Sequence, residues 1–197
     1  MSISYNKGDG IWIDDGPGNV IGGTAANEAN ALAFNDGCGV RVTGAGAVGN
    51  SLHGNIINEN GQLGIDLGGD GVTPNDNVPF DPDSGPNSLQ NYPVITSATS
   101  VGGFTTIKGD LKTRAQQTYL LEFYSSTQKD PSGYGEGLTP IGSTQVSTDA
   151  VGTATFSGDI PWGYCWKPDN RDRHGNRQRQ HLRIFRRGGF CQWGQQT

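Results

Sequence analysis

One pattern of eleven residues occurs three times in the first part of the chain. It reads apolar, two variable residues, Asn, three variable residues, Gly, apolar, any residue, apolar, and it covers residues 3–13, 32–42 and 57–67. The copies are offset by 29 and 25 residues, within the range of roughly 20–50 residues that marks solenoids and other repeat arrays. Such a chain folds as stacked coils, because each repeat buries its apolar face only against its neighbours.

The end of each copy alternates apolar, variable, apolar, which is the two-residue period of a strand. The middle residues, Trp12, Arg41 and Asp66, are expected to point outward in one column with a spacing of about 4.8 Å. At that spacing we expect Arg41 and Asp66 to form a surface ion pair. We expect the shared Asn and Gly to turn the chain, because both tolerate positive φ. A second recurring segment, residues 18–21 and 49–52, adds another short strand to each coil. Short strands bounded by Asn or Gly predict a right-handed parallel β-helix.

Three stretches, residues 18–24, 63–76 and 91–94, resemble the repeat region of large secreted bacterial surface proteins, the right-handed parallel β-helix repeat proteins of CSLREA type. The resemblance covers about residues 3–160, and the stretch LGIDLGGDGVTPND at 63–76 is its most specific part. It implies an extracellular, multi-domain parent protein, and it does not imply an enzyme.

The start of the chain has neither the basic nor the apolar region of a signal peptide, and no apolar run approaches the length of a membrane span. The first repeat copy follows Met1 almost directly, whereas terminal repeats normally differ from internal ones. We therefore expect the sequence to be the C-terminal fragment of a longer secreted or cell-surface protein.

The second half predicts a different β architecture. Residues 69–92 are an acidic linker dense in Gly, Pro, Asn and Asp, and five strand candidates follow, at 94–99, 105–111, 119–124, 141–146 and 153–156. Tyr119, Leu121 and Phe123 share one face, and residues 149–152 have the composition of a hairpin turn. The expected fold is all-β: β-helix coils at 1–68, then an immunoglobulin-like β-sandwich at 93–161, truncated because such sandwiches carry about seven strands.

The last segment, residues 162–197, differs from the rest in charge. Residues 1–160 hold 6 Lys and Arg against 17 Asp and Glu, whereas residues 161–197 hold 8 against 2. A basic end on an acidic body is typical of nucleic-acid binding, but this tail has neither helical periodicity nor a nucleic-acid motif. We interpret it as an irregular basic tail translated out of frame, because a one-nucleotide shift of residues 177–187 permits Asp-Asn-Ala-Asn-Thr-Ser-Glu-Phe-Ser-Ala, a strand-like ending.

An acidic run in the linker is the candidate metal site. Asp81-Pro82-Asp83-Ser84-Gly85 has the alternating oxygen ligands and the Gly of part of a calcium loop, and Asp70 and Asp76 lie nearby in the sequence. There is no closing bidentate Glu, so the alternative is an ordinary solvated acidic turn. The three cysteines, Cys38, Cys165 and Cys191, match no zinc spacing. Calcium is therefore the one cofactor that the sequence suggests.

No residue pattern identifies catalysis. Asp14 and Asp15 are adjacent, so on a strand they point to opposite faces and form a poor acid–base pair. His53 is expected to be a solvated turn residue, and Asn19, Asn30, Asn50 and Asn55 are expected to stack their amides between coils.

Three functions remain open. The first is a structural or adhesive segment without catalysis of its own, which binds extracellular polysaccharide or cell-surface components through Trp12, Arg41 and Asp66. The second is a polysaccharide lyase or glycoside hydrolase of β-helix type. The third is nucleic-acid binding through the basic tail, which the absence of a motif disfavours.

The out-of-frame interpretation makes a prediction at the level of the gene. Read one nucleotide further on, the codons of residues 177–187 should encode the strand-like ending given above. Sequencing the coding DNA checks this, and codons that cannot produce those residues in the shifted frame would exclude the interpretation.

Overall fold

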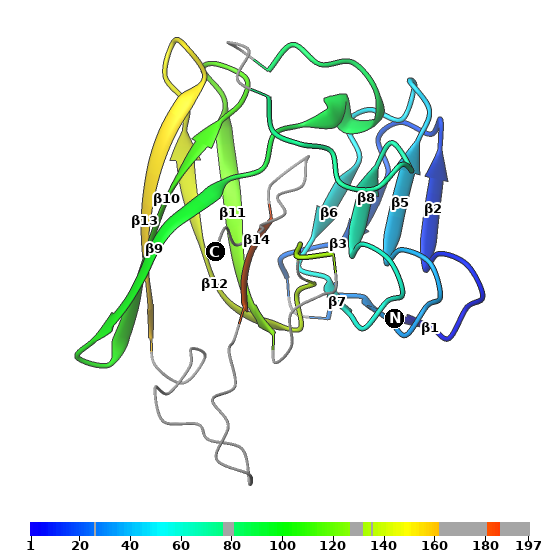
Figure 1. Ribbon diagram of the computed structural model, residues 1–197, viewed down its shortest axis with the longest axis horizontal. Coiled ribbons are helices and arrows are strands. Elements are labelled where there is room, and N and C mark those ends of the chain that lie inside the picture. The colour runs from blue at the N-terminus through cyan, green and yellow to red at the C-terminus, as the bar shows by residue number, and fades with distance from the viewer. Residues whose placement is uncertain (26, 77–80, 127–131, 135, 162–180, 186–197) are drawn as a thin grey trace, which may run out of the picture.

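The computed structural model describes residues 1–25, 27–76, 81–126, 132–134, 136–161 and 181–185. The protein is all-β, as predicted: the described residues form strands β1 to β14 and a single 3-10 turn, η1 (Pro86–Leu89). Figure 1 shows the short strands β1 to β8 on one side of the molecule and the longer strands β9 to β14 on the other. Within the described part of the chain, no helix is long and apolar enough to cross a membrane.

The first half consists of three parallel sheets that follow the sequence repeat. The three sheets run β1-β4-β7, β2-β5-β8 and β3-β6. Their strands are β1 (Ser2–Ser4), β4 (Ala31–Ala33), β7 (Ile56–Asn58), β2 (Ile11–Asp14), β5 (Val40–Thr43), β8 (Ile65–Leu67), β3 (Val20–Gly22) and β6 (Ser51–His53). The first two sheets take one strand from each of the three copies, and the third takes its two strands from the second recurring segment. The predicted register is confirmed, with Ile11 paired to Val40 and Val40 to Ile65.

The apolar repeat positions form the core between these sheets. Leu32, Val40 and Val42 are fully buried, and Ile57, Ile65 and Leu67 are nearly so. Because these residues occupy equivalent positions in successive copies, like side chains lie above one another, and each coil covers the apolar side chains of the next.

The shared glycines are needed for close approach of neighbouring coils. A Cβ at Gly10 would lie 2.6 Å from the carbonyl oxygen of Gly39, and one at Gly39 would lie 2.6 Å from that of Gly64. No side chain fits at such distances, so the repeat requires glycine there whatever its φ.

The prediction that the shared asparagines turn the chain by adopting positive φ was wrong. The residue with positive φ is the one before each asparagine: Tyr5, Phe34 and Glu59, at 59°, 57° and 54°. Left-handed backbone is costly for such side chains. Stacking of the Tyr5 and Phe34 rings, with centroids 5.1 Å apart, accompanies this conformation on the outside of the turn.

The asparagines instead link the coils through their side chains. The amide Nδ2 of Asn6 donates to Oδ1 of Asn35 at 2.9 Å, and that of Asn35 donates to Oδ1 of Asn60 at 2.8 Å. The backbone N–H groups of Asn6 and Asn35 donate to the same two oxygens. Two further ladders join Asn19 to Asn50 and Asn30 to Asn55, which confirms the stacking predicted for these four residues.

The second half contains two antiparallel sheets with a common core. One sheet runs β13-β10-β9 and the other β12-β11-β14. The strands are β9 (Val94–Val101), β10 (Phe104–Lys112), β11 (Thr118–Ser126), β12 (Thr139–Ser147), β13 (Thr153–Pro161) and β14 (His181–Phe185). The five strands expected here all form. Tyr119, Leu121 and Phe123 are fully buried in the core between the sheets, which confirms that they share a face.

Two expectations for this half need correction. The turn at residues 149–152 forms, with Gly152 N donating to the carbonyl of Asp149 at 3.2 Å, but it joins β12 and β13, which belong to different sheets. The turn is therefore an arch that connects two sheets, whereas a hairpin turn would connect two neighbouring strands of one sheet. In the tail, expected to be irregular, His181–Phe185 form β14 and pair antiparallel with β11. The other tail residues, 162–180 and 186–197, lie outside the described residues.

The second half closes the end of the coil stack. Glu136 accepts hydrogen bonds from the side chain and the backbone of Asn60, the last member of its ladder, and Asn87 of η1 accepts one from the backbone of Asn50. The backbone of Ile57 donates to Gly137, and Tyr124 of β11 packs into the coil core. The segment predicted to be a linker thus contributes buried residues, among them Asn87, to the junction.

The ladder predicts a large difference between two asparagines. Asn35 is 1% exposed, and Asn35→Ala removes the side-chain donor to Asn60 Oδ1 as well as the acceptor of Asn6, so it should lower the free energy of unfolding by about 3 kcal/mol. Asn6 is exposed at the end of the ladder, and Asn6→Ala should cost less than about 1 kcal/mol. Urea unfolding of both variants measures this. Equal losses of unfolding free energy in the two variants would contradict the prediction that the buried asparagine of the ladder contributes more than the exposed one.

Candidate functional site

The outward column predicted from the repeat lies on the sheet β2-β5-β8. Trp12 pairs with Arg41 and Arg41 with Asp66 in adjacent strands. The three side chains differ in exposure: Trp12 is 63% exposed, whereas Asp66 is only 2% exposed. The indole Nε1 of Trp12 donates to Oγ1 of Thr43 at 2.7 Å, which fixes the ring on the sheet surface.

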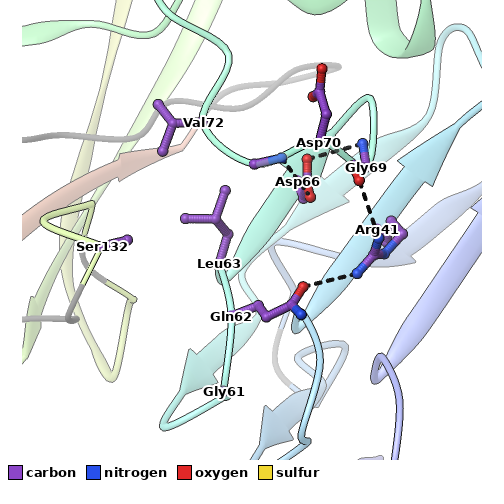
Figure 2. Close-up of a pocket in the computed structure, with 10 residues that line it drawn as sticks. Arg41, Gly61, Gln62, Leu63, Asp66, Gly69, Asp70, Val72 and Ser132 are labelled. Carbon is purple, nitrogen blue, oxygen red and sulfur yellow. Dashed lines mark hydrogen bonds between the residues drawn. The ribbon is translucent and has the colours of Figure 1, made fainter.

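Beside Arg41 and Asp66 the surface opens into a pocket of about 510 Å³. Figure 2 shows that Arg41 lies on one side of it and that the turn after β8, with Gly69 and Asp70, lies above Asp66. Its remaining wall residues come from the turn before β8, from the segment after β8 and, in the second half, from between β11 and β12: Gly61, Gln62, Leu63, Gly71, Val72 and Ser132. The pocket therefore lies between the last coil and the segment that leaves it.

Arg41 is held in place by bonds to three segments. Its Nε donates to Oδ2 of Asp9 at 2.8 Å, and its NH2 group donates to Asp9 Oδ1 at 3.2 Å and to Gln62 Oε1 at 2.9 Å. Its NH1 group donates to the carbonyl of Gly69 at 3.3 Å. The ion pair expected between Arg41 and Asp66 does not form among the described residues, since Arg41 pairs with Asp9 instead.

Asp66 lies between the core residues Ile65 and Leu67 and is buried beneath the turn that follows β8. One carboxylate oxygen accepts from the backbone N–H of Gly69 at 3.1 Å, and the other accepts from that of Gly71 at 3.3 Å. Burial raises the pKa of this carboxyl above its ordinary value, and the two amides and the charge of Arg41 oppose that shift. Asp66 thus serves chiefly to hold the turn that forms the pocket wall.

Cys38 lies beneath the same site as a buried thiol. Its sulfur lies 3.8 Å from Asp66 Oδ2, and burial, followed by the negative charge of Asp66, raises the pKa of Cys38 to about 12. The raised pKa disfavours the thiolate, which makes Cys38 a poor nucleophile at neutral pH.

Three of the four predicted calcium ligands come together elsewhere. Carboxylate oxygens of Asp76, Asp81 and Asp83 all lie within 4.8 Å of one another. Asp70 is not in this group and lines the pocket beside Arg41. Burial, followed by the charges of Asp76 and Asp81, raises the pKa of Asp83 above its ordinary value.

His53 is not the solvated turn residue that the sequence suggested. It ends β6 and is 8% exposed, with Nδ1 at 3.9 Å from Oε2 of Glu122 on β11. Glu122 also accepts from the backbone of Gly54 at 3.1 Å. Sequence reasoning missed this contact because its partners are far apart in the chain and neither belongs to a motif.

Asp9, Gln62 and Glu136 were also missed. Asp9 and Gln62 occupy variable positions of the repeat, and Glu136 lies in a loop of the second half. Only the observation that Arg41 sits at an outward position, and so needs an acidic partner near it, could have pointed to Asp9.

The adjacent carboxylates of Asp14 and Asp15 make separate local bonds. Asp14 Oδ1 accepts from Thr43 Oγ1 at 2.8 Å, whereas Asp15 Oδ1 accepts from the backbone of Gly46. The two carboxylates therefore do not face a common groove as an acid–base pair would.

No protein-family model matches the chain, and no match was found among curated proteins.

The pocket geometry predicts unequal costs for two basic residues. The pair Arg41–Asp9 has side chains 22% and 14% exposed, so Arg41→Ala leaves a poorly solvated carboxylate and should lower the free energy of unfolding by about 2 kcal/mol. The pair Lys7–Asp36 is 93% and 58% exposed, and Lys7→Ala should cost less than about 0.5 kcal/mol. Chemical denaturation of the two variants compares them. A cost for Arg41→Ala as small as that for Lys7→Ala would mean that solvent screens this pair too.

Proposed function

We propose that the chain is a structural and adhesive segment of a secreted or cell-surface bacterial repeat protein, and that residues 1–68 are coils of a right-handed parallel β-helix. The three parallel sheets, each built from equivalent strands of successive repeat copies, support this architecture. The two antiparallel sheets that enclose the second core support an immunoglobulin-like sandwich for the rest.

The observation that carries the proposal is how the polar residues of the coils are used. The asparagines donate and accept within ladders, Arg41 is bonded to Asp9, Gln62 and Gly69, and Asp66 is bonded to backbone amides. Groups committed in this way stabilise a rigid stack and are poorly placed to transfer protons. A rigid, closed stack suits a scaffold that presents a surface.

The surface it would present is the face of the sheet β2-β5-β8. Trp12 projects from its first strand, and Arg41 and the pocket lie beside it. An exposed aromatic ring offers a flat apolar surface with a polar edge, and a polar pocket next to it can bind hydroxyl groups. The ligand class that fits both features is a polysaccharide or another glycosylated component outside the cell.

A second candidate is a polysaccharide lyase or hydrolase, because Asp66 and Asp70 line the same pocket and the pKa of Asp66 is raised. The low exposure of Asp66 and its two backbone bonds disfavour this role. Nucleic-acid binding through the basic tail stays a prediction, since most of that tail lies outside the described residues.

Adhesion predicts that Trp12 contributes directly to binding. Trp12→Ala should weaken the binding of the chain to bacterial extracellular polysaccharides by about tenfold or more, because it removes the large aromatic ring that strand β2 exposes on this face. Phe104→Ala, which removes a ring that is 51% exposed on β10, is the matched control and should leave the affinity unchanged.

Cosedimentation with insoluble polysaccharides and glycan-array binding measure the affinity, and analysis of the same mixtures for released sugars tests for cleavage. Binding that both variants retain in full would contradict the assignment of this face. Release of sugar products, lost in Asp70→Asn, would establish the enzyme in place of the adhesive segment.

A further inference from the structure

The segment between β8 and β9 carries an acidic cluster that the proposed function does not use. One carboxylate oxygen from each of Asp76, Asp81 and Asp83 lies within 4.8 Å of the others. None of the ion pairs found among the described residues involves these three carboxylates. Three like charges at such separations repel one another, so the arrangement needs a compensating cation or proton.

The spread of the oxygen atoms fits one calcium ion. Calcium binds oxygen ligands at about 2.3–2.6 Å, so two ligands of one ion can be at most about 5 Å apart. All three oxygens satisfy this limit as they stand. Magnesium requires about 2.0–2.1 Å, with ligands no more than about 4.2 Å apart, and it retains several waters. Calcium accepts irregular coordination shells, whereas magnesium demands a near-ideal octahedron, so calcium is the ion we assign to three carboxylates on one irregular segment.

Asp81 supplies a second, independent observation. It is 2% exposed, and its Oδ2 accepts from Thr113 Oγ1 at 2.6 Å and from the backbone N–H of Asn91 at 3.2 Å. Its Oδ1 is also buried and has no hydrogen-bond partner in the part of the chain that the structure describes. A buried carboxylate oxygen without a partner costs free energy, which a bound cation would recover.

The neighbouring ligand is also oriented before any ion binds. The side chain of Asn91 donates to Asp76 Oδ1 at 3.1 Å and to the carbonyl of Asp76 at 3.3 Å, and its own Oδ1 accepts from the backbone N–H of Asp76 at 3.1 Å. Asn91 thereby connects Asp76 to Asp81 across the cluster. Fixed ligands lose less conformational entropy on binding.

We propose that Asp76, Asp81 and Asp83 form a calcium site, with the free Oδ1 of Asp81 as its buried ligand and water in the remaining positions. Asp81 itself bonds to Thr113, which follows β10, and to Asn91, which precedes β9, so an ion that fixes Asp81 also fixes these two contacts. Calcium would therefore strengthen the junction between the two halves. Sites in extracellular modules bind in the range of about 0.1–1 mM.

Calorimetric titration and thermal unfolding of the full chain, first treated with chelator, test the site with calcium chloride and then with magnesium chloride. We expect one calcium ion per chain and a melting temperature that rises with calcium concentration, because the ion binds only the folded state. Magnesium should bind at least about tenfold more weakly.

Asp83→Asn should weaken calcium binding at least about tenfold, while its melting temperature in chelator equals or exceeds that of the wild type, since it removes a repelling charge. Asp76→Asn is the second variant should the first fail to fold. Asp70→Asn, on the same segment but outside the cluster, is the matched control and should bind calcium normally.

Three results would overturn the site. The first is no heat and no change in melting temperature at about 10 mM calcium, and the second is unchanged binding in Asp83→Asn and Asp76→Asn. Loss of binding in Asp70→Asn would place the ion elsewhere and would also overturn it. None of these measurements involves a polysaccharide, so their outcome is separate from that of the adhesion experiment.

Discussion

The hydrogen bonds between Asn60 and Glu136 allow the stack of coils to end. In each ladder an asparagine needs a partner on the next coil, and the last one has no next coil. Asn60 is buried, and Glu136 accepts from both its backbone and its side chain, the latter at 2.7 Å. Without such a partner, a buried amide would cost about 1–3 kcal/mol. The second half of the chain is therefore part of the structure of the first.

The repeat predicted much of the coil architecture because register in a solenoid is a local property. Once Val40 is aligned with Ile11, pairing and burial follow from the two-residue period of the strand. The antiparallel strands were located for a similar reason, since alternation marks them in the sequence. The sequence did not show which strands share a sheet. The turn at residues 149–152 has the composition of a hairpin, yet the two strands that it joins belong to different sheets.

The sequence did not reveal contacts whose partners are distant in the chain or lie at variable positions of the repeat. Glu136 lies 76 residues from Asn60, and Asp9 lies 32 residues from Arg41. The prediction that Arg41 would pair with Asp66 used strand neighbours alone, and it failed because the turn after β8 satisfies Asp66 with backbone amides. The positive φ of Phe34 was missed because the adjacent asparagine is the usual residue for that conformation.

The sequence of the acidic segment suggested a metal site, but it could not show which of the four aspartates lie together. Asp70, Asp76, Asp81 and Asp83 all lie on one segment, and nothing in their spacing separates Asp70 from the others. The separation comes from Asp66, which fixes the turn of Gly69 and Gly71 and so keeps Asp70 at the pocket. Asp81, by contrast, is drawn into the protein by Thr113 and Asn91. The same segment thus lines the pocket at its start and bonds to the antiparallel half at its end, so both sites lie on the segment that connects the two halves.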